Sequence, residues 1–434
     1  MHIHILGIAG TFMGSLALIA KGLGHQISGQ DEGVYPPMST QLDEQNINYS
    51  NGYLLQDLPK ADIYIIGNAL SRGNICVEEI LHNQWAYTSG AQWLSENVLQ
   101  NKWVLAVAGT HGKTTTASML AWILQQAGLN PSFLIGGVAD NFGISSRLTD
   151  SDFFVIEADE YDSAFFDKRS KFVHYHPKTL LINNLEFDHG DIFDSIKDIQ
   201  KQFHHLLRIV PDNGLVIYPP DNQNIEQVLA MGVYSAKQML PAAEISLSEK
   251  GTTFTCKDGS VDWNLLGAHN MQNGLGAIYA AAHIGINFAT ASAALGTFAG
   301  VKRRLEVKYQ SAYITLYDDF AHHPTAIKTT LAGLRNKIGT EEIIAILELR
   351  SNTMKSGVHQ QTLAKSLSDA DRVLVLRPEN QDWDIDAAFA KGNLFASVDA
   401  IVTELKQIKQ GHFVVMSNGD FGGIFNKIIK QLKG

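Results

Sequence analysis

A glycine-rich segment in the middle of the chain has the composition of a phosphate-binding loop. It reads Gly109-Thr110-His111-Gly112-Lys113-Thr114-Thr115-Thr116 and follows the apolar run 103–108. Glycines let backbone N–H groups turn toward phosphate oxygens, and a helix that follows adds the positive end of its dipole. Lys113 can reach the outer phosphates of a nucleotide, and the Thr114 hydroxyl is placed to ligate Mg²⁺. The strict P-loop pattern has glycine where this chain has Val107, so a glycine turn with an incidental lysine is the alternative.

Four acidic residues follow a second apolar run, 153–156, and could hold a metal ion. They are Glu157, Asp159, Glu160 and Asp162. A nucleotide bound with Mg²⁺ needs hard oxygen ligands, which carboxylates supply. Taken alone, such a cluster is more often a solvated loop. Beside a phosphate loop it favours a metal site, although the spacing does not say which acid is the ligand.

A histidine near the end of a third apolar run, 179–182, is a candidate for a second metal site. The run continues as Asn183-Asn184-Leu185-Glu186-Phe187-Asp188-His189. Open α/β sheets place their ligands at the carboxyl ends of strands, where His189 would lie. A structural role for a lone histidine is the alternative.

The composition excludes several classes of protein. The chain has 434 residues, and 34 Lys and Arg against 44 Asp and Glu give a formal net charge of −10. A nucleic-acid-binding protein normally carries a basic surplus, so nucleic acid is not an expected partner. Cys76 and Cys256 are too few for a disulfide framework, and neither has a metal-binding spacing. Segment 1–7 lacks a basic stretch and a cleavage site, so we expect a first strand and a cytoplasmic protein.

The segment from Trp263 to Val301 contains no Asp, Glu, Lys or Arg, which raises the question of a membrane span. Several Asn and His residues interrupt it, and alanine makes up most of its apolar content. A span needs about 20 predominantly and strongly apolar residues. We therefore expect two buried helices separated near 285–287, and no membrane.

Short apolar runs alternate with helical patterns along the chain, which is typical of α/β folds with parallel sheets. A polar stretch at 95–102 and the basic cluster 302–304 mark two boundaries. We predict three tandem α/β domains, at 1–100, 101–300 and 301–434. The expected strands are 3–8, 26–28, 63–66, 103–108, 153–156, 179–182, 314–317, 343–347, 372–376 and 413–416, and the expected helices include 16–23, 325–335 and one ending at 433.

Six segments together resemble the Mur ligase family, the ATP-dependent amide ligases of peptidoglycan synthesis. In chain order they are 109–116, Glu157-Ala-Asp-Glu160, Asn184…Asp188-His189, Gly267-Ala-His-Asn270-Met-Gln-Asn273, Gly300-Val-Lys-Arg303-Arg304 and Asp318-Asp319-Phe-Ala-His322-His323-Pro324. The resemblance implies a Rossmann-like UDP-binding domain, a central P-loop ATPase-type domain and a C-terminal Rossmann-like domain that binds the amine substrate.

The resemblance also implies roles for matching positions, with ATP and Mg²⁺ as cofactors. Asn270 and Asn273 would contact the adenine, and Arg304 (or Arg303, since the register is ambiguous) and Asp319 would reach the nucleotide from the third domain. The residues implied to hold the nucleotide phosphates are Gly109, Thr110, His111, Gly112, Lys113, Thr114 and Thr115. The implied metal ligands are Thr114, Glu157 and His189, and the implied catalytic residues are Lys113, Glu157, His189, Arg304, Asp319 and His323.

Within the family, the first and third domains resemble members that join a recycled tripeptide to UDP-N-acetylmuramate. The segments that carry this likeness are 10–14, 34–39, 67–74 and 348–355, with the charged insert 167–171. The turn that would hold the pyrophosphate contains Gly7, Gly10, Thr11, Phe12 and Met13, and Asp31 fits the uridine end.

Cations near residue 350 could bind the carboxylates of the tripeptide L-Ala-γ-D-Glu-meso-diaminopimelate. Arg350 offers a planar fork for a carboxylate, and Asn352 and Lys355 offer further donors. A basic surface loop is the alternative.

The implied reaction activates the lactyl carboxylate of UDP-N-acetylmuramate as an acyl phosphate, which the tripeptide amine attacks to give an amide, ADP and phosphate. His323, or His322 beside it, is the candidate base for the amine proton. Ligation of L-alanine to the same nucleotide sugar is the nearest alternative. A P-loop regulatory NTPase and a Rossmann oxidoreductase are alternatives of other classes. No obligate protein partner is inferred.

Overall fold

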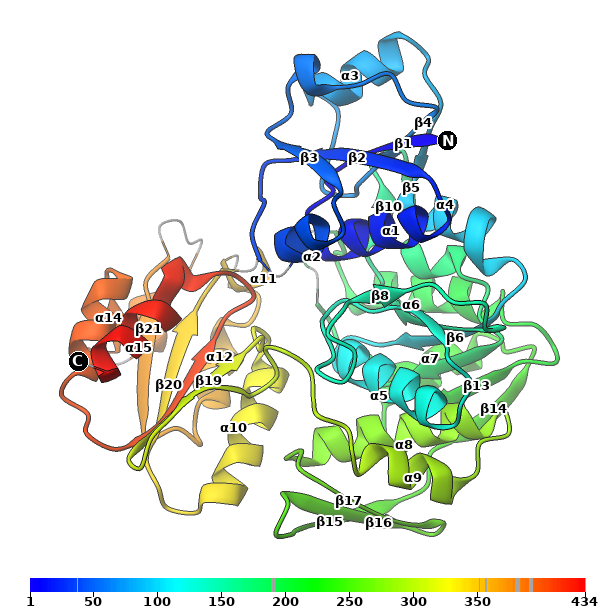
Figure 1. The fold of residues 1–434 in the computed structure, drawn as a ribbon. Coiled ribbons are helices and arrows are strands. Elements are labelled where there is room, and N and C mark those ends of the chain that lie inside the picture. Colours follow the sequence, from blue (N-terminus) through cyan, green and yellow to red (C-terminus); the bar gives the residue numbers. More distant parts are fainter. Residues whose placement is uncertain are drawn as a thin grey trace.

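A computed structural model describes residues 1–36, 38–188, 190, 192–350, 352–355, 357–378, 383–389 and 393–433, with the backbone alone at 352 and 353. The chain forms three α/β units, each built on its own main sheet (Figure 1). The three-domain α/β class predicted from the alternating pattern is confirmed. The predicted boundaries at residues 100 and 300 stay a prediction, although no main sheet crosses either position.

The first unit holds a five-stranded parallel sheet in the order β3-β2-β1-β4-β5. Strand order reverses beside β1, so the turn after β1 lies at a topological switch point, where such sheets bind ligands. Its strands are β1 (His2–Leu6), β2 (Gln26–Asp31), β3 (Asn48–Asn51), β4 (Ile63–Ile66) and β5 (Tyr87–Ser89), and its helices are α1 (Thr11–Gly22), α2 (Met38–Glu44), η1 (Leu55–Asp57), α3 (Ile75–His82), α4 (Gly90–Leu94) and η2 (Ser95–Leu99).

The central unit holds a seven-stranded sheet in the order β14-β13-β12-β6-β9-β7-β8, parallel except for β8. The hairpin β10–β11 and the antiparallel sheet β15-β16-β17 are additions to it. Its strands are β6 (Trp103–Ala108), β7 (Ser132–Leu134), β8 (Ser146–Arg147), β9 (Phe153–Ala158), β10 (Asp162–Ala164), β11 (Asp167–Ser170), β12 (Thr179–Ile182), β13 (Leu215–Tyr218), β14 (Ala236–Met239), β15 (Ala243–Leu247), β16 (Thr252–Cys256) and β17 (Gly259–Trp263), and its helices are α5 (Lys113–Gln126), η3 (Lys171–His174), α6 (Ile196–Leu207), α7 (Gln223–Ala230), α8 (Ala268–Ala282) and α9 (Phe288–Leu295).

The third unit holds a six-stranded sheet in the order β18-β19-β23-β20-β21-β22, parallel except for β18. Its strands are β18 (Glu306–Gln310), β19 (Ile314–Asp319), β20 (Ile343–Glu348), β21 (Arg372–Leu376), β22 (Leu394–Phe395) and β23 (Gly411–Met416), and its helices are α10 (Pro324–Ile338), α11 (Asn352–Lys355), α12 (Gln360–Ser366), α13 (Ile385–Ala388), α14 (Val398–Leu405), η4 (Phe421–Gly423) and α15 (Ile424–Lys433).

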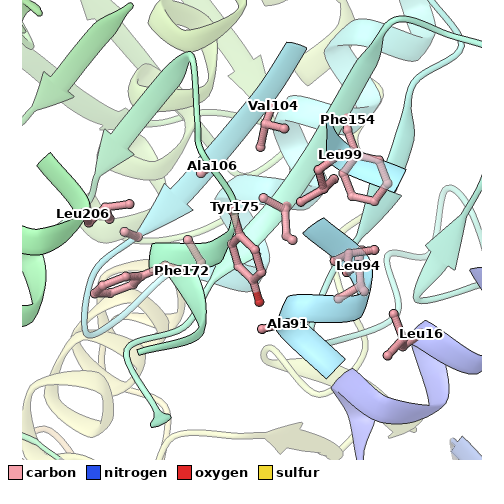
Figure 2. Close-up of a cluster of buried hydrophobic side chains, with 14 of the residues drawn as sticks. Leu16, Ala91, Leu94, Leu99, Val104, Ala106, Phe154, Phe172, Tyr175 and Leu206 are labelled. Carbon is pink, nitrogen blue, oxygen red and sulfur yellow. The ribbon is translucent and has the colours of Figure 1, made fainter. Parts of the chain in front are cut away.

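The first and central units share one hydrophobic core. Figure 2 shows Leu16, Leu94 and Leu99 of the first unit beside Val104 and Phe154 of the central sheet. Buried hydrogen bonds extend this interface: the Ser15 hydroxyl donates to the Ser145 hydroxyl, and the Ser146 hydroxyl donates to the Ser15 carbonyl. These two units are therefore held as one body.

The third unit joins the central one through a narrower contact. The linker pairs with the central unit at the bridge between Ala139 and Val301, and α10 packs against α8. The contact between α10 and α8 is close because two glycines meet there: a Cβ on Gly333 would lie 3.3 Å from the Cα of Gly267.

The uncharged segment forms two helices, as predicted. Helix α8 ends at Ala282, Gly285 adopts a positive φ of 91°, and Asn287 caps α9 through its side chain. In the parts of the chain that the structure describes, no helix combines the length and the apolar character that a bilayer span requires.

Candidate active site

A cleft of about 1150 Å³ lies between the central and third units and reaches the first unit. It opens where the strands of the central sheet end, as expected for an α/β ligand site. Segments predicted from the sequence to carry chemistry line it: 110–115, 157–159, 269–273, 303–305 and 319–323.

The glycine-rich segment forms a loop between strand β6 and helix α5. Gly109 and Gly112 adopt positive φ angles of 132° and 78°, which favour glycine over residues with a Cβ. A Cβ on Gly112 would lie 2.5 Å from Asn273 Oδ1, so the site leaves no room for a side chain there. Helix α5 begins at Lys113, which places its free N–H groups beside the loop. The predicted order of strand, turn and helix is confirmed.

Lys113 is buried among carboxylates. Its Nζ lies 2.7 Å from Glu160 Oε2 and 3.6 Å from Asp159 Oδ1. Burial lowers the pKa of Lys113, but the charges of Glu160, Asp159 and Glu157 outweigh burial and raise the pKa above its usual range. The lysine therefore stays charged, as a phosphate-binding group must.

Glu157 is the carboxylate that lies beside the threonine of the loop. Its Oε1 accepts the Thr114 hydroxyl at 3.1 Å, and its Oε2 accepts the Gly136 N–H at 2.6 Å. Asp162, by contrast, pairs with Lys168 at 2.6 Å in the β10–β11 hairpin. Burial raises the pKa of Glu157, although Lys113 opposes this effect. The Thr114 hydroxyl and the Glu157 carboxylate together offer the hard oxygen ligands that Mg²⁺ prefers. A cation bound to both would favour the ionised form of Glu157.

Asn184 fixes the phosphate loop from the neighbouring strand. Its Oδ1 accepts the His111 N–H at 2.8 Å, and its Nδ2 donates to the His111 carbonyl at 3.1 Å. The loop is thus held to the end of β12 by a side chain of the segment that carries the second predicted metal ligand. That ligand, His189, lies outside the described residues.

The two amides predicted to contact adenine lie on one face of α8 and line the cleft. Asn273 Nδ2 donates to Asn270 Oδ1 at 3.3 Å, and Asn270 Nδ2 donates to the Leu266 carbonyl at 2.8 Å. Asn183 Nδ2 also donates to Asn273 Oδ1 at 3.4 Å, so the amides form a chain that begins at the phosphate loop.

The two adjacent arginines of the third unit have different environments. The Arg303 guanidinium donates to the carbonyls of Ser417 and Gly419 at 2.7 and 2.8 Å, and it pairs with Asp318 at 3.4 Å. Arg304 stacks its guanidinium over the Phe320 ring, 5.1 Å from the centroid. Both line the cleft, but Arg303 is occupied by its own unit, so Arg304 is the better candidate for a nucleotide ligand.

Asp319 holds the loop that carries these arginines. Its Oδ2 accepts the Leu305 N–H at 2.7 Å and its Oδ1 accepts the Ala321 N–H at 2.8 Å. Arg303 and Leu305 adopt positive φ angles of 60° and 52°, which are strained for residues with a Cβ. Burial raises the pKa of Asp319, and the Arg304 charge opposes this effect.

Two histidines and a glutamate from different units meet at the mouth of the phosphate loop. Ring nitrogens of His111 and His323 and a carboxylate oxygen of Glu186 all lie within 4.8 Å of one another. The Thr325 hydroxyl donates to Glu186 Oε2 at 2.7 Å, and the His359 ring lies 4.4 Å from the His323 ring. The sequence did not single out Glu186, Thr325 or His359 as site residues. Glu186 contacts the loop within the central unit, where its N–H donates to the Thr110 hydroxyl at 2.9 Å, whereas packing of the third unit brings Thr325 and His359 to the site.

The turn after β1 is built as predicted, with its carboxylate engaged by the backbone. Asp31 Oδ2 accepts the Ala9 N–H and its Oδ1 accepts the Gly33 N–H, both at 2.9 Å. Gly7 has a positive φ of 84°, and Gly10 caps α1. No described contact tests whether Asp31 or Met13 binds a nucleotide sugar.

A buried lysine connects this turn to the phosphate loop. Lys171 Nζ lies 5.5 Å from the Phe12 ring centroid and 3.1 Å from Asp159 Oδ2, and Asp159 also faces Lys113. Thr11, one residue before Phe12, lines the cleft. The first unit therefore contributes to the same cleft as the phosphate loop.

Arg350 follows strand β20 and is exposed, outside the lining of the cleft. Its side chain covers Gly419, where a Cβ would lie 1.8 Å from the Arg350 Nη1. Asn418, next to it, does line the cleft. Lys355 is half-buried beyond the cleft lining, and the side chain of Asn352 lies outside the described part of the chain.

Three family models match consecutive parts of the chain. The catalytic domain of the Mur ligase family matches residues 2–102, the Mur ligase middle domain matches 107–281, and the Mur ligase glutamate ligase domain matches 303–418.

Curated proteins and solved structures are similar to this chain over most or all of its length. It is 52% identical to UDP-N-acetylmuramate–L-alanyl-γ-D-glutamyl-meso-2,6-diaminoheptandioate ligase of Escherichia coli (strain K12), over 100% of this chain and 98% of that protein. A crystal structure of a murein peptide ligase from Psychrobacter arcticus is 44% identical with a TM-score of 0.78, over 100% and 98% of the two chains. UDP-N-acetylmuramate–L-alanine ligase of Desulforapulum autotrophicum is 31% identical, over 80% of this chain and 77% of that protein.

Fold and site together define an enzyme of three α/β domains whose phosphate loop faces an arginine supplied by the third domain. The chain belongs to the Mur ligase family, and it is therefore a ligase. The family predicted from six sequence segments is confirmed.

Proposed function

We propose that the chain joins L-alanyl-γ-D-glutamyl-meso-diaminopimelate to UDP-N-acetylmuramate, with ATP converted to ADP and phosphate. The observation that carries this proposal is the 52% identity, over the full length of both chains, to the relative of that name. The L-alanine ligase has 31% identity over 80% of this chain, so the tripeptide is the better supported amine. Recycling of peptidoglycan in the cytoplasm is the setting that this substrate implies.

The phosphate loop and Glu157 would hold the nucleotide and its metal. Thr114 and Glu157 are the described groups that would ligate Mg²⁺, with His189 as a further ligand, and the ion would supply positive charge to the phosphates. Lys113 would exchange its pairing with Glu160 for a phosphate oxygen when ATP enters. The charge of Lys113 then stabilises the phosphoryl group as it passes to the lactyl carboxylate.

The third domain would complete the site and supply the amine. Arg304, held by the loop that Asp319 fixes, would add a second cation to the phosphates. Closure between the domains would also bring the tripeptide amine to the acyl phosphate and exclude water. Arg350 beside Gly419 would receive a tripeptide carboxylate at the outer rim of the cleft.

A phosphate-release assay tests the amine substrate. Purified protein is incubated with ATP, Mg²⁺ and UDP-N-acetylmuramate, with the tripeptide, with L-alanine or with no amine. We expect rapid release with the tripeptide, little with L-alanine and little without an amine. Release with L-alanine alone would identify an alanine ligase, and equal release in all three would support a regulatory NTPase instead.

A lysine variant controls for contaminating ATPases. Lys113→Met removes the cation that faces the phosphates and should abolish release in every arm. Lys168→Met removes a lysine from the exposed β10–β11 hairpin and should leave turnover unchanged.

A further inference from the structure

A buried histidine in the cleft lining has a ring nitrogen with no hydrogen-bond partner among the described residues. His323 is the N-cap of α10, and its Nδ1 accepts the backbone N–H of Thr325 at 3.2 Å. The residue is 6% exposed and lines the cleft. Among the described residues, none forms a hydrogen bond with its Nε2. Leaving a buried polar atom without a hydrogen-bond partner is unfavourable, so a bound group is the expected partner.

The cap fixes where the ring proton lies. Nδ1 can accept the Thr325 N–H only through a free lone pair, so the proton of the neutral ring must be on Nε2. Burial lowers the pKa of His323 to about 3, and the nearby His111 adds to this effect while Asp188 and Glu186 oppose it. The ring is therefore neutral at pH 7 and carries one N–H donor, at Nε2.

This donor lies beside the loop that would bind the reacting phosphate. The His323 ring lies 4.4 Å from the ring of His111, which is part of the phosphate loop. His359 lies on the other side of His323, also at 4.4 Å. Glu186 forms no hydrogen bond with the His323 ring; its Oε2 accepts the Thr325 hydroxyl at 2.7 Å and lies 3.5 Å from His111 Nε2.

The same geometry argues against two other roles for His323. A base would need a lone pair on Nε2, and the neutral ring has its only free lone pair already engaged at Nδ1. A metal ion at Nε2 would also need a lone pair there, so the ring proton would have to move to Nδ1 and break the cap, or the ring would have to lose its remaining N–H proton and become an imidazolate. The proximity of His111, Glu186 and His323 therefore does not make His323 a metal ligand.

We propose that His323 donates its Nε2–H to an anionic oxygen of the reacting centre. This inference rests on the proposed ligase function. The oxygen is either a phosphoryl oxygen during formation of the acyl phosphate or the oxyanion that forms when the amine attacks the acyl carbon. In both cases the donor stabilises charge that grows in the transition state, and the proton stays on the ring.

Two substitutions separate the cap from the donor. His323→Asn keeps an oxygen that can cap α10, since asparagine is among the best N-caps, but it lacks the distal ring N–H. His323→Ala removes both. We expect both variants to lose about 10²- to 10³-fold in kcat, the usual cost of one such donor. Only His323→Ala should also lose thermal stability.

Trapping the acyl phosphate with hydroxylamine, without tripeptide, shows which oxygen the donor serves. Slower trapping in His323→Asn would assign it to the phosphoryl oxygen, and normal trapping with slow amide formation would assign it to the oxyanion. A wild-type level of kcat in His323→Asn would overturn the proposal. So would activity that recovers as pH rises, because hydroxide can replace a missing base but cannot replace a hydrogen-bond donor.

The ring proton can be located without any substrate. In protein labelled with ¹⁵N at histidine, a signal that His323→Asn removes should report a neutral ring with its proton on Nε2. A proton on Nδ1 would overturn the proposal even if the enzyme is active. If the wild-type enzyme shows no tripeptide-dependent turnover, the proposed function fails, and the ring measurement still decides the tautomer.

Discussion

Arg303 and Arg304 are neighbours in the sequence, yet their side chains serve different parts of the molecule. Arg303 binds two carbonyl groups after β23, at Ser417 and Gly419, and so ties the linker to its own domain. Arg304 stacks on Phe320 and lines the cleft. Both guanidinium groups lie over the Phe320 ring, at 5.3 and 5.1 Å, but among the described residues only Arg303 bonds to carbonyl groups of its own domain, and Asp319 holds the strained turn that carries both. We therefore expect Arg303 to contribute chiefly to stability and Arg304 chiefly to catalysis.

Methionine substitutions test this division, because methionine keeps much of the apolar stem. Arg303→Met should lower stability by roughly 1.5–3 kcal/mol, the value of hydrogen bonds to a charged group, as measured by urea unfolding. Arg304→Met should leave stability within about 0.5 kcal/mol and lower kcat at least tenfold in the phosphate-release assay. The reverse pattern, with Arg303→Met stable and inactive, would assign the nucleotide to Arg303.

Strand β1 contains a buried histidine that makes the first sheet sensitive to acid. His4 is 1% exposed, and its Nδ1 lies 2.8 Å from the Ser28 hydroxyl of β2. Burial lowers the pKa of His4 from 6.5 to about 4, with Gln30 opposing and His2 adding to the shift. Because the folded state binds this proton less readily than the unfolded state, the sheet is fully stable above about pH 6.5 and loses stability as pH falls toward 4.

His4→Gln should remove this step from the pH dependence of stability. The shift corresponds to roughly 3 kcal/mol by pH 4, so the wild-type free energy of unfolding should fall by that order between pH 6.5 and 4. The variant should be less stable at pH 7.5, because the cavity fits imidazole, but flatter over this window. Urea unfolding at each pH measures both the stability at pH 7.5 and its change with pH.

His82→Gln, at an exposed position of α3, is the control and should keep the wild-type dependence of stability on pH. Equal slopes in all three proteins would contradict the assignment.

The elements that the sequence predicted best are those buried on both faces. Strands 63–66, 103–108, 179–182 and 372–376 match the structure at both ends, because parallel strands in the middle of a sheet are continuous apolar runs. The edge strand β3 is polar and short, and no pattern marked it. Helix α1 begins at Thr11 rather than 16, since Gly10 caps a first turn that lies over the sheet.

In the candidate site, too, some features could be predicted from the sequence and others could not. Local geometry around the phosphate loop follows from sequence, because Gly112, Lys113 and Thr114 are consecutive residues at the start of one helix. The meeting of His111 with His323 does not follow, because it depends on how two domains pack. His359 lies in a segment without a recognisable motif, and only its ring contact with His323 draws attention to it.

The whole molecule is a rigid pair of domains with a third domain attached through a smaller contact. Residues of the first and central domains share one core cluster, beside further clusters of each domain, whereas the third domain has two core clusters that contain only its own residues. Calorimetry should therefore resolve two transitions. Leu94→Ala in the shared core should lower one of them by about 2–5 kcal/mol, and Ile346→Ala in β20 should lower the other by a similar amount. A single transition that both variants shift equally would contradict this division.

We expect the glycine contact between α8 and α10 to govern how closely the third domain approaches α8, and so closure between the domains. Gly333 lies in the interior of α10, and a Cβ there would approach Gly267, whose positive φ of 87° leaves its backbone little freedom to move. Gly333→Val should push the third domain away from α8 and carry Arg304 out of the cleft. We expect kcat to fall at least tenfold and the radius of gyration from X-ray scattering to rise. Helix α10 should stay folded, since valine is a better helix former than glycine.

Lys328→Val, on an exposed face of α10, is the matched control and should leave both kcat and the radius of gyration unchanged. If Gly333→Val keeps the wild-type radius of gyration and turnover, the contact does not govern closure and the position of Arg304 must be set by the linker alone.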